Sequence, residues 1–342
     1  MTIATVLIPT HEHVLSLRHA VASVQQQTLQ DFELFIVGDG VSNAGRALVA
    51  ELAAADSRIR FFDFPKGPRK GEVHRHQALR QARGRFVAYL GDDDIWLPNH
   101  LEVLGALLAA ADFGHTLQVG VDAKGEFVFL AADLENPDFR QRMLTELFNR
   151  FDFTFAGHTL EAYRRLPHGW RTTPPDFPWT DLYMWRQFLA EPWCRARSAI
   201  VPTGINTWTH LRPHLSDRER ADELGHLRAQ AATPAFHDEL WRAVAQCFAR
   251  ESVGFELDRY GALRAAEQSK SEIAQLRQSL ERSQTSLAAS TAQCAQAQLE
   301  IARLEAQQAA HRAELEAMRG STSWRLTYPV RQVGRLITKL RR

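Results

Sequence analysis

Two spacings of apolar residues alternate along the first 110 positions of the chain. Short apolar runs, typical of buried strands, predict strands at residues 3–8, 33–37, 59–63 and 86–90. Between them, apolar residues recur at helical spacing and predict helices at 14–27, 44–55, 72–83 and 98–111. Strands that alternate with helices in this way indicate an α/β fold, with a mostly parallel sheet covered by helices on both faces.

The pattern changes after this region. Residues 115–131 predict a hairpin that turns at 122–125, where the sequence reads Asp-Ala-Lys-Gly. Residues 150–215 are rich in aromatic residues, proline and histidine, and their elements cannot be assigned. Residues 220–262 indicate helix, with a break near Thr233 and Pro234.

From residue 266 the composition shifts to Gln, Ala, Ser, Glu, Leu and Arg, and no glycine or proline occurs before Gly320. Seven-residue spacing is maintained through this segment, as in a coiled coil. The a positions are Ile273, Leu280, Leu287, Cys294, Ile301, Gln308 and Leu315. The d positions are Leu276, Ser283, Ser290, Ala297, Leu304, His311 and Met318. Several of these side chains bury little, so the segment is either a self-associating coiled coil or a long solvated spacer helix.

Composition narrows the possible classes of protein. The formal net charge of +1 gives no global field that would attract nucleic acid or an acidic partner. Three widely separated cysteines, Cys194, Cys247 and Cys294, argue against a disulfide framework and a structural zinc site, and fit a reducing cytoplasm. The sequence contains no run of about 18 apolar residues, so it predicts no membrane span. The first residues do not have the pattern of a signal peptide.

Polar residues follow the predicted strands at the edge where parallel α/β sheets bind ligands. Pro9 and Thr10 follow the first strand, Asp39 follows the second strand, and residues 91–94 (Gly-Asp-Asp-Asp) follow the fourth strand. Adjacent carboxylates repel one another in an apolar setting, and Mg²⁺ or Mn²⁺ would relieve that repulsion. Alternatively, the acids cap the following helix, for which Asp94 is well placed.

Five motifs together resemble the family-2 glycosyltransferases. These are residues 5–10, 22–28, 33–40, 74–84 and 89–98, in which the last reads Tyr-Leu-Gly-Asp-Asp-Asp-Ile-Trp-Leu-Pro. The resemblance covers roughly residues 3–105 and implies a GT-A fold that transfers a sugar from a nucleotide-diphosphate donor. It predicts four segments: a catalytic domain (1–215), a helical extension (216–265), a coiled coil (266–319) and a basic amphipathic tail (320–342).

The resemblance also implies roles for individual residues. Pro9, Thr10 and Asp39 match positions that hold the nucleotide. Asp93 matches the acid that holds Mn²⁺ or Mg²⁺ on the donor diphosphate, and Asp92 is a second donor-site residue. The chain departs from the family at Gly38 and Gly91, where acids are usual.

Two further site residues follow from the same comparison. Asp181, in the sequence Pro-Trp-Thr-Asp, matches the segment that carries the catalytic base, which would deprotonate the acceptor hydroxyl in an inverting transfer. Its alternative role is a first-turn acid of a helix. Arg75 would face the donor phosphates as a hydrogen-bond donor. Alternatively, Arg75 belongs with His74 and His76 to a basic first turn of a helix that is exposed to solvent. His210 is a weaker metal or phosphate candidate.

The tail suggests where the protein acts. From Trp324 to Arg342 basic residues interleave with apolar ones and no acid occurs, which is typical of a segment that binds a membrane surface. We therefore expect a cytoplasmic enzyme of surface polysaccharide or glycolipid synthesis, with contact to the inner membrane face and a saccharide or lipid-linked acceptor. The alternatives are a nucleotidyltransferase, which usually has a Gly-rich loop that this chain lacks after its first strand, and an inactive scaffold that acts through its coiled coil.

Overall fold

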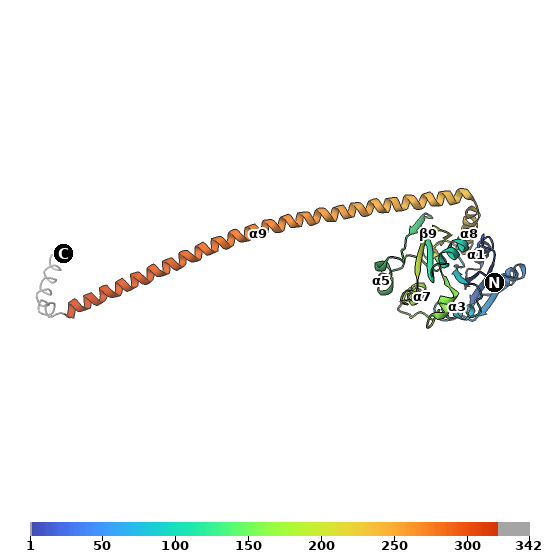
Figure 1. Cartoon of the computed structure of the whole chain (residues 1–342), viewed down its shortest axis with the longest axis horizontal. Coiled ribbons are helices and arrows are strands. Elements are labelled where there is room, and N and C mark those ends of the chain that lie inside the picture. The colour runs from blue at the N-terminus through green and yellow to red at the C-terminus, as the bar shows by residue number, and fades with distance from the viewer. Residues whose placement is uncertain (1, 321–342) are drawn as a thin grey trace. The chain divides into compact units, whose positions relative to one another are not determined.

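The computed structural model describes residues 2–320, in which residues up to Ser252 form one compact unit and a second unit begins at Val253. The strands of the first unit are β1 (Ala4–Thr10), β2 (Phe32–Asp39), β3 (Ile59–Phe64), β4 (Phe86–Tyr89), β5 (Ile95–Trp96), β6 (Phe113–Val121), β7 (Phe127–Leu130), β8 (Ala156–Thr159), β9 (Ala196–Pro202) and β10 (Gly204–Ile205). Its α-helices are α1 (Val14–Gln25), α2 (Asn43–Ala55), α3 (Glu72–Leu79), α4 (His100–Leu108), α5 (Pro137–Thr145), α6 (Leu160–Arg165), α7 (Thr180–Leu189), α8 (Asp217–Ala231) and the start of α9 (Pro234–Gly320) (Figure 1). Two short 3₁₀ helices, η1 (Phe153–Phe155) and η2 (Thr209–Leu211), lie in the connections.

The main sheet has the strand order β3-β2-β1-β4-β8-β6-β7, and β9 pairs with β6. The pairs among β3, β2, β1 and β4 are parallel. β8 runs antiparallel to both β4 and β6, and the hairpin of β6 and β7 is antiparallel. The predicted α/β class with a mostly parallel sheet flanked by helices is therefore confirmed. The antiparallel hairpin of β6 and β7 lies where residues 115–131 predicted one, whereas β8 and β9 come from the segment whose elements could not be assigned.

Alternate residues of the parallel strands enter two different cores. Val6 and Ile8 of β1 pack with α1, α2 and α4, whereas Leu7 packs with α3, α6 and α7. Both faces of β1, β2 and β4 are buried, which explains why these strands are mainly apolar. A third core lies under α8 and the first turns of α9, where Leu224 and Leu240 pack against apolar residues of β6 and β7.

Several predicted boundaries were wrong by a few residues. The fourth helix begins at His100, so Pro98 precedes it and does not occupy its first turn. The third helix ends at Leu79 rather than at residue 83. The predicted break near residue 233 is confirmed, since α8 ends at Ala231 and α9 begins at Pro234.

The described part of the second unit, 253–320, is one continuous helix. Its predicted apolar seam is open to solvent: Ile273, Leu276, Leu280, Leu287, Ile301, Leu304 and Leu315 are 51–70% exposed. The long helix is confirmed, while pairing of this helix with another copy remains a prediction. The predicted tail lies, apart from Gly320, outside the described residues.

Two expectations from composition can be compared with the structure. Among residues 2–320, no helix is both long and apolar enough to cross a membrane. Cys194, Cys247 and Cys294 are all free, as their spacing predicts.

Candidate active site

Three strands end at one edge of the parallel part of the sheet. β1 ends at Thr10, β2 at Asp39 and β4 at Tyr89, and β1 is paired in parallel with both neighbours. Open α/β sheets bind ligands at this edge. The loop after β1 carries His13 at the start of α1, and the loop after β4 carries the three consecutive aspartates.

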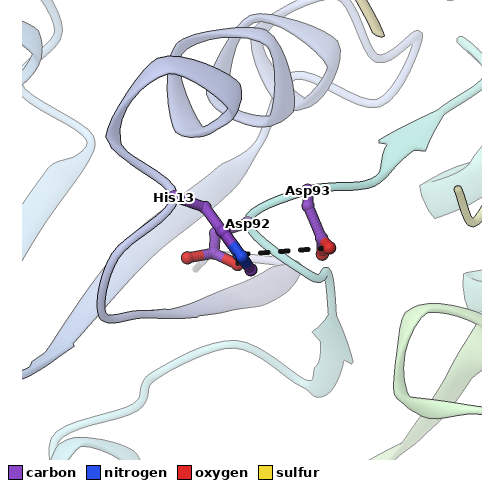
Figure 2. Close-up of side chains that lie close together, drawn as sticks. All are labelled: His13, Asp92 and Asp93. Atoms are coloured by element: carbon purple, nitrogen blue, oxygen red, sulfur yellow. Dashed lines mark hydrogen bonds and ion pairs between the residues drawn. The ribbon is translucent and has the colours of Figure 1, made fainter. Parts of the chain in front are cut away.

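These two loops place an imidazole beside two carboxylates (Figure 2). Nδ1 of His13 lies 3.0 Å from Oδ1 of Asp92 and 4.0 Å from Oδ2 of Asp93. One potential ligand atom from each residue lies within 4.8 Å of the others. Imidazole nitrogen and carboxylate oxygen both bind divalent first-row metal ions, so this donor set fits a divalent cation. Asp92 and Asp93 were predicted for this site, whereas His13 was not.

The two carboxylates favour positive charge in this cluster, whether as a proton on His13 or as a metal ion. A hydrogen bond to Asp92 raises the pKa of His13 to about 9, although burial acts in the opposite direction. Burial, and then the charge of Asp92, raise the pKa of Asp93. The side chain of Asp93 keeps 22% of its surface accessible, so the carboxylate can still be reached by a ligand.

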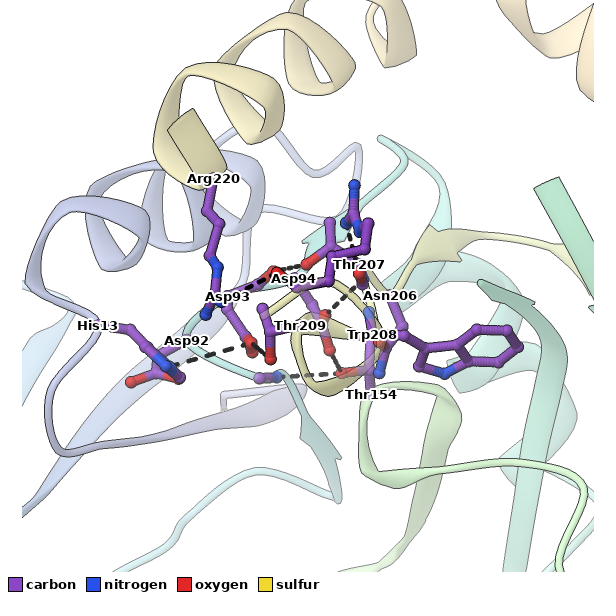
Figure 3. Close-up of polar contacts among 12 residues, drawn as sticks. His13, Asp92, Asp93, Asp94, Thr154, Asn206, Thr207, Trp208, Thr209 and Arg220 are labelled. Atoms are coloured by element: carbon purple, nitrogen blue, oxygen red, sulfur yellow. Dashed lines mark hydrogen bonds and ion pairs between the residues drawn. The ribbon is translucent and has the colours of Figure 1, made fainter. Parts of the chain in front are cut away.

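The third aspartate has a different role (Figure 3). Asp94 is buried and accepts hydrogen bonds from the Thr154 hydroxyl and, at 3.3 Å, from the backbone N–H of Thr207. Helix α4 has Asn99 at its N-cap, so the interpretation of Asp94 as the cap of that helix was wrong. Asp94 instead ties the loop after β4 to two distant segments.

The segment that contains Thr207 also holds Asp93 in place. The hydroxyl of Thr209 donates to Oδ2 of Asp93 at 3.1 Å, and the hydroxyl of Thr207 donates to its backbone carbonyl at 3.0 Å. Both threonines lie in the stretch after β10. The position of the predicted metal residue therefore depends on residues more than 100 positions away in the sequence.

A cavity of about 450 Å³ opens beside this loop. Its walls include Asp93, Arg75 from α3 and Asp181 from α7, so the predicted metal, phosphate and base residues face one space. The weaker candidate His210 also lines it and is exposed. A larger cavity of about 950 Å³ lies beside Ile3 and Phe86 at the other end of β1 and β4, and none of the predicted site residues lines it.

Arg75 is a buried cation with unused hydrogen-bonding capacity. Its Nη2 donates to the carbonyl of Lys70 at 3.1 Å, whereas its Nε is buried without a hydrogen-bond partner. The guanidinium lies 4.7 Å from the ring centre of Trp170 and 5.0 Å from that of Phe153. The alternative prediction, in which Arg75 and His74 belong to a solvated basic first turn, is therefore wrong, because both residues are buried. A buried guanidinium with a free N–H is suited to bind an anion.

Asp181 occupies the first turn of α7. Burial raises the pKa of its carboxyl, and the backbone N–H of Leu182 donates to Oδ1 at 2.8 Å. Nδ2 of Asn149 donates to Oδ2 at 3.2 Å. A carboxylate whose pKa is raised towards neutrality can accept a proton from a hydroxyl, which agrees with the predicted base, while its position also agrees with a first-turn acid.

Sequence reasoning missed several residues of the cavity wall, among them Asp152 and Trp208. Burial raises the pKa of Asp152 to about 7, and its carboxylate accepts hydrogen bonds from Gln118 at 3.0 Å and from Asn206. Trp208 has a φ of 37°, which is unusual for a bulky residue and typical of functional sites. Both lie in residues 150–215, where the spacing of apolar residues gives no pattern that would have found them.

The predicted nucleotide residues do not line this cavity. Pro9 and Thr10 end β1, and Asp39 ends β2. Asp39 accepts hydrogen bonds from the backbone N–H of Gly67 at 2.6 Å and from Nζ of Lys66 at 2.7 Å. These residues lie at the same sheet edge as the cavity, and their role in nucleotide binding remains a prediction.

Comparison with known proteins supports the resemblance. Residues 5–166 match the sequence profile of the family described as Glycosyl transferase family 2. The matched segment contains β1 to β4 and the His13–Asp92–Asp93 cluster, and it ends before Asp181.

Two curated relatives match over 103 residues each. One, 32% identical over 29% of this chain and 32% of the relative, is the GalNAc(5)-diNAcBac-PP-undecaprenol beta-1,3-glucosyltransferase of Campylobacter jejuni. The other, 33% identical over 30% of this chain and 39% of the relative, is the UDP-Glc:alpha-D-GlcNAc-diphosphoundecaprenol beta-1,3-glucosyltransferase WfgD of Escherichia coli. The chain thus matches only about a third of the length of these relatives. Among solved structures, S. aureus TarS 1-349 is similar with a TM-score of 0.46 and 16% identity, over 67% of this chain and 65% of that chain.

Proposed function

Residues 5–166 form a glycosyl transferase family 2 domain, and from this premise we propose that the protein transfers a sugar from a nucleotide-diphosphate donor to an acceptor hydroxyl, with inversion at the anomeric carbon. One observation carries the proposal: Asp93, Arg75 and Asp181, which come from three separate segments, face one cavity at the carboxyl edge of the sheet. Its volume of about 450 Å³ is within the usual range for small-molecule sites.

Each of these residues has a part in the reaction. The acceptor oxygen attacks the anomeric carbon, the bond from that carbon to the phosphate oxygen breaks, and the nucleoside diphosphate leaves. Asp181 takes the proton of the attacking hydroxyl, and burial has already raised the pKa of this carboxyl. Arg75 donates hydrogen bonds from its unpaired Nε and its guanidinium edge to the diphosphate as negative charge develops there.

The transfer is proposed to require Mn²⁺ or Mg²⁺. The donor set of His13, Asp92 and Asp93 fits such an ion. When bound, the ion would neutralise charge on the leaving diphosphate. The side chain of Asp93 is held by Thr209, so its ligand oxygen is already positioned before an ion binds.

The acceptor is proposed to be a saccharide, free or linked to a lipid diphosphate. The names of both curated relatives specify diphosphoundecaprenol-linked glycans as acceptors. An enzyme with such an acceptor would work at the cytoplasmic face of the inner membrane, and the basic tail after Gly320 is the segment predicted to bind there.

The decisive test is release of nucleoside diphosphate from a panel of UDP-, GDP- and dTDP-sugars with Mn²⁺ or Mg²⁺. We expect release from one donor, lost after chelation and in Asp93→Asn, and slowed by about 10²- to 10⁴-fold in Asp181→Asn. Pyrophosphate as the product would instead indicate a nucleotidyltransferase. No release and no metal-dependent nucleotide binding would favour the inactive scaffold.

A further inference from the structure

We propose that His13 is a metal ligand of this chain and replaces the carboxylate that is missing at Gly91. The inference rests on the proposed function, because it concerns the ion that would hold the donor diphosphate. It adds His13, from a different segment of the chain, to the predicted ligands Asp92 and Asp93, and it predicts which metal ions the site prefers.

The structure explains why residue 91 cannot supply a ligand. A Cβ atom at Gly91 would lie 2.6 Å from Oδ2 of Asp94, closer than real Cβ atoms approach another atom. Asp94 cannot easily move, because it is buried and hydrogen bonded to Thr154 and Thr207. The backbone N–H of Gly91 itself donates to the Thr154 hydroxyl at 3.1 Å. An acidic side chain at position 91 would therefore require Asp94 to shift out of these hydrogen bonds.

His13 is held where it can take over that role. It is the N-cap residue of α1, and its side chain makes no capping hydrogen bond, so the imidazole is directed to the two aspartates instead (Figure 2). Leu17 and Val21 anchor α1 in the core, which fixes the backbone of His13. A ligand on a rigid element binds a metal with less loss of conformational entropy than one on a mobile loop.

An ion pair of purely structural value is the competing explanation. Such a pair satisfies the imidazole through Asp92 alone, at 3.0 Å. It also leaves Asp93 4.0 Å away from the imidazole and next to a second carboxylate, whose charge disfavours its own. A divalent cation held by all three residues would remove the repulsion between the carboxylates.

The cluster also lies beside a source of positive charge for an anion. Helix α8 packs against both α1 and β5, and Arg220 extends from it towards the Asp93 side of the cluster (Figure 3). The Nε of Arg220 is buried without a hydrogen-bond partner. A metal-bound diphosphate would provide acceptors for this group.

One imidazole ligand predicts the choice of ion. Mg²⁺ prefers an all-oxygen octahedral shell, whereas Mn²⁺ and Co²⁺ accept nitrogen more readily. We therefore expect the full-length protein to bind Mn²⁺ more tightly than Mg²⁺. Exchanging the imidazole for a carboxylate in His13→Asp should reduce or reverse that preference.

The experiment is a titration of the full-length protein with Mn²⁺ alone, followed by water-proton relaxation and by pulsed electron paramagnetic resonance, which detects nitrogen bound to Mn²⁺. We expect nitrogen coupling in the wild type and its loss in His13→Ala, His13→Asn and His13→Asp. Affinity should fall by roughly 10- to 100-fold in His13→Ala and in Asp93→Asn. His11→Ala is the matched control, because His11 is a partly exposed histidine in the same loop, and it should bind Mn²⁺ as the wild type does.

The outcomes separate this inference from the proposed function. If Mn²⁺ binding depends on Asp93 but neither affinity nor nitrogen coupling changes in the His13 variants, His13 is not a ligand and the metal-dependent transferase stands. If the wild type binds no Mn²⁺ at millimolar concentration but still releases nucleoside diphosphate, the metal site is wrong and the transferase activity stands. Circular dichroism melting of each variant without metal shows whether any loss of binding reflects misfolding.

Discussion

Asn149 donates a hydrogen bond from Nδ2 to Oδ2 of Asp181 over 3.2 Å, and so ties the segment before η1 to the first turn of α7. The bond stabilises the charged form of a carboxyl whose pKa is already raised by burial. In Asn149→Leu we expect the pKa of Asp181 to rise further. The acid limb of the profile of kcat/KM against pH should then shift to higher pH, and the rate below that limb should fall.

The control for this prediction is Asp181→Asn, which removes the base and should abolish the acid limb together with most of the turnover. Equilibrium binding of the nucleoside diphosphate should stay the same in both variants, because neither side chain is proposed to touch it. An acid limb that stays in place in Asn149→Leu would show that a different group limits the rate.

Arg75 provides a second test, because its guanidinium is buried and its Nε has no partner. A hydrogen bond to a charged group contributes about 1.5–3 kcal/mol. Arg75→Gln should therefore weaken binding of the nucleoside diphosphate by roughly 10- to 100-fold. Binding of the corresponding nucleoside should hardly change, and calorimetric titration with both ligands measures the difference. Arg80→Gln, an exposed arginine at the end of the same helix, is the matched control. An equal loss of affinity for both ligands would show that Arg75 contacts the base or ribose, or that it only stabilises the fold.

Three buried histidines make stability depend on pH. Burial lowers the pKa of His100 to about 3 and the pKa values of His115 and His158 to about 4. The unfolded chain protonates these groups near pH 6.5, so it binds more protons than the native state between that pH and the lowered values. The contribution of these histidines to stability is thus greatest above pH 6.5 and falls as the pH drops, by up to about 1.4 kcal/mol per pH unit for each histidine. The raised pKa of Asp152 acts in the opposite direction below about pH 7.

Melting temperatures between pH 7.5 and 5 check this dependence. In His100→Phe the ring still stacks on Trp96 but loses its hydrogen bond to Thr203, so the variant should melt lower at pH 7.5. Its melting temperature should also fall less steeply with acid, because one of the three groups is gone. The exposed His168→Asn should leave the slope unchanged. A dependence on pH in His100→Phe equal to that of the wild type would contradict the prediction.

The fold was predictable where local sequence determines it. The parallel strands β1, β2 and β4 are buried on both faces, and this produces the apolar runs that alternate with helices. Strand β8, which is antiparallel to β6, and strand β9, which is parallel to it, could not be assigned. Their residues are partly polar, and their pairing with β6 depends on contacts distant in the sequence. Asp94 was misinterpreted for a related reason, since its partners Thr154 and Thr207 are far from it along the chain.

The same distinction applies to the site. Asp92 and Asp93 were predicted because they follow a strand and match a family motif. His13 was missed although it also follows a strand, because nothing local shows that it would turn towards Asp92. Asp181 was placed by its motif, but its partner Asn149 became evident only from the packing of α7.

The exposed seam of the long helix provides the last prediction. Leu304 occupies a d position and is 54% exposed, and it shares its face with Ile301 at an a position. A helix of this length with a repeated apolar face is stabilised by pairing with a second copy. We therefore expect sedimentation equilibrium to show an oligomer of the full-length protein, and we expect Leu304→Ser to shift it towards the monomer and to lower the melting temperature of the helix.

Leu299 is the matched control for this experiment. It is 73% exposed on the same helix, five residues earlier, but lies at an f position on the side opposite the seam. Leu299→Ser removes the same apolar group from a similar helical context, so any change that both variants share reflects helix propensity or solubility. A loss of association confined to Leu304→Ser would identify the heptad seam as the interface. A monomer at every concentration in the wild type would instead support the spacer helix, because an unpaired seam that remains in water has no partner to bury it.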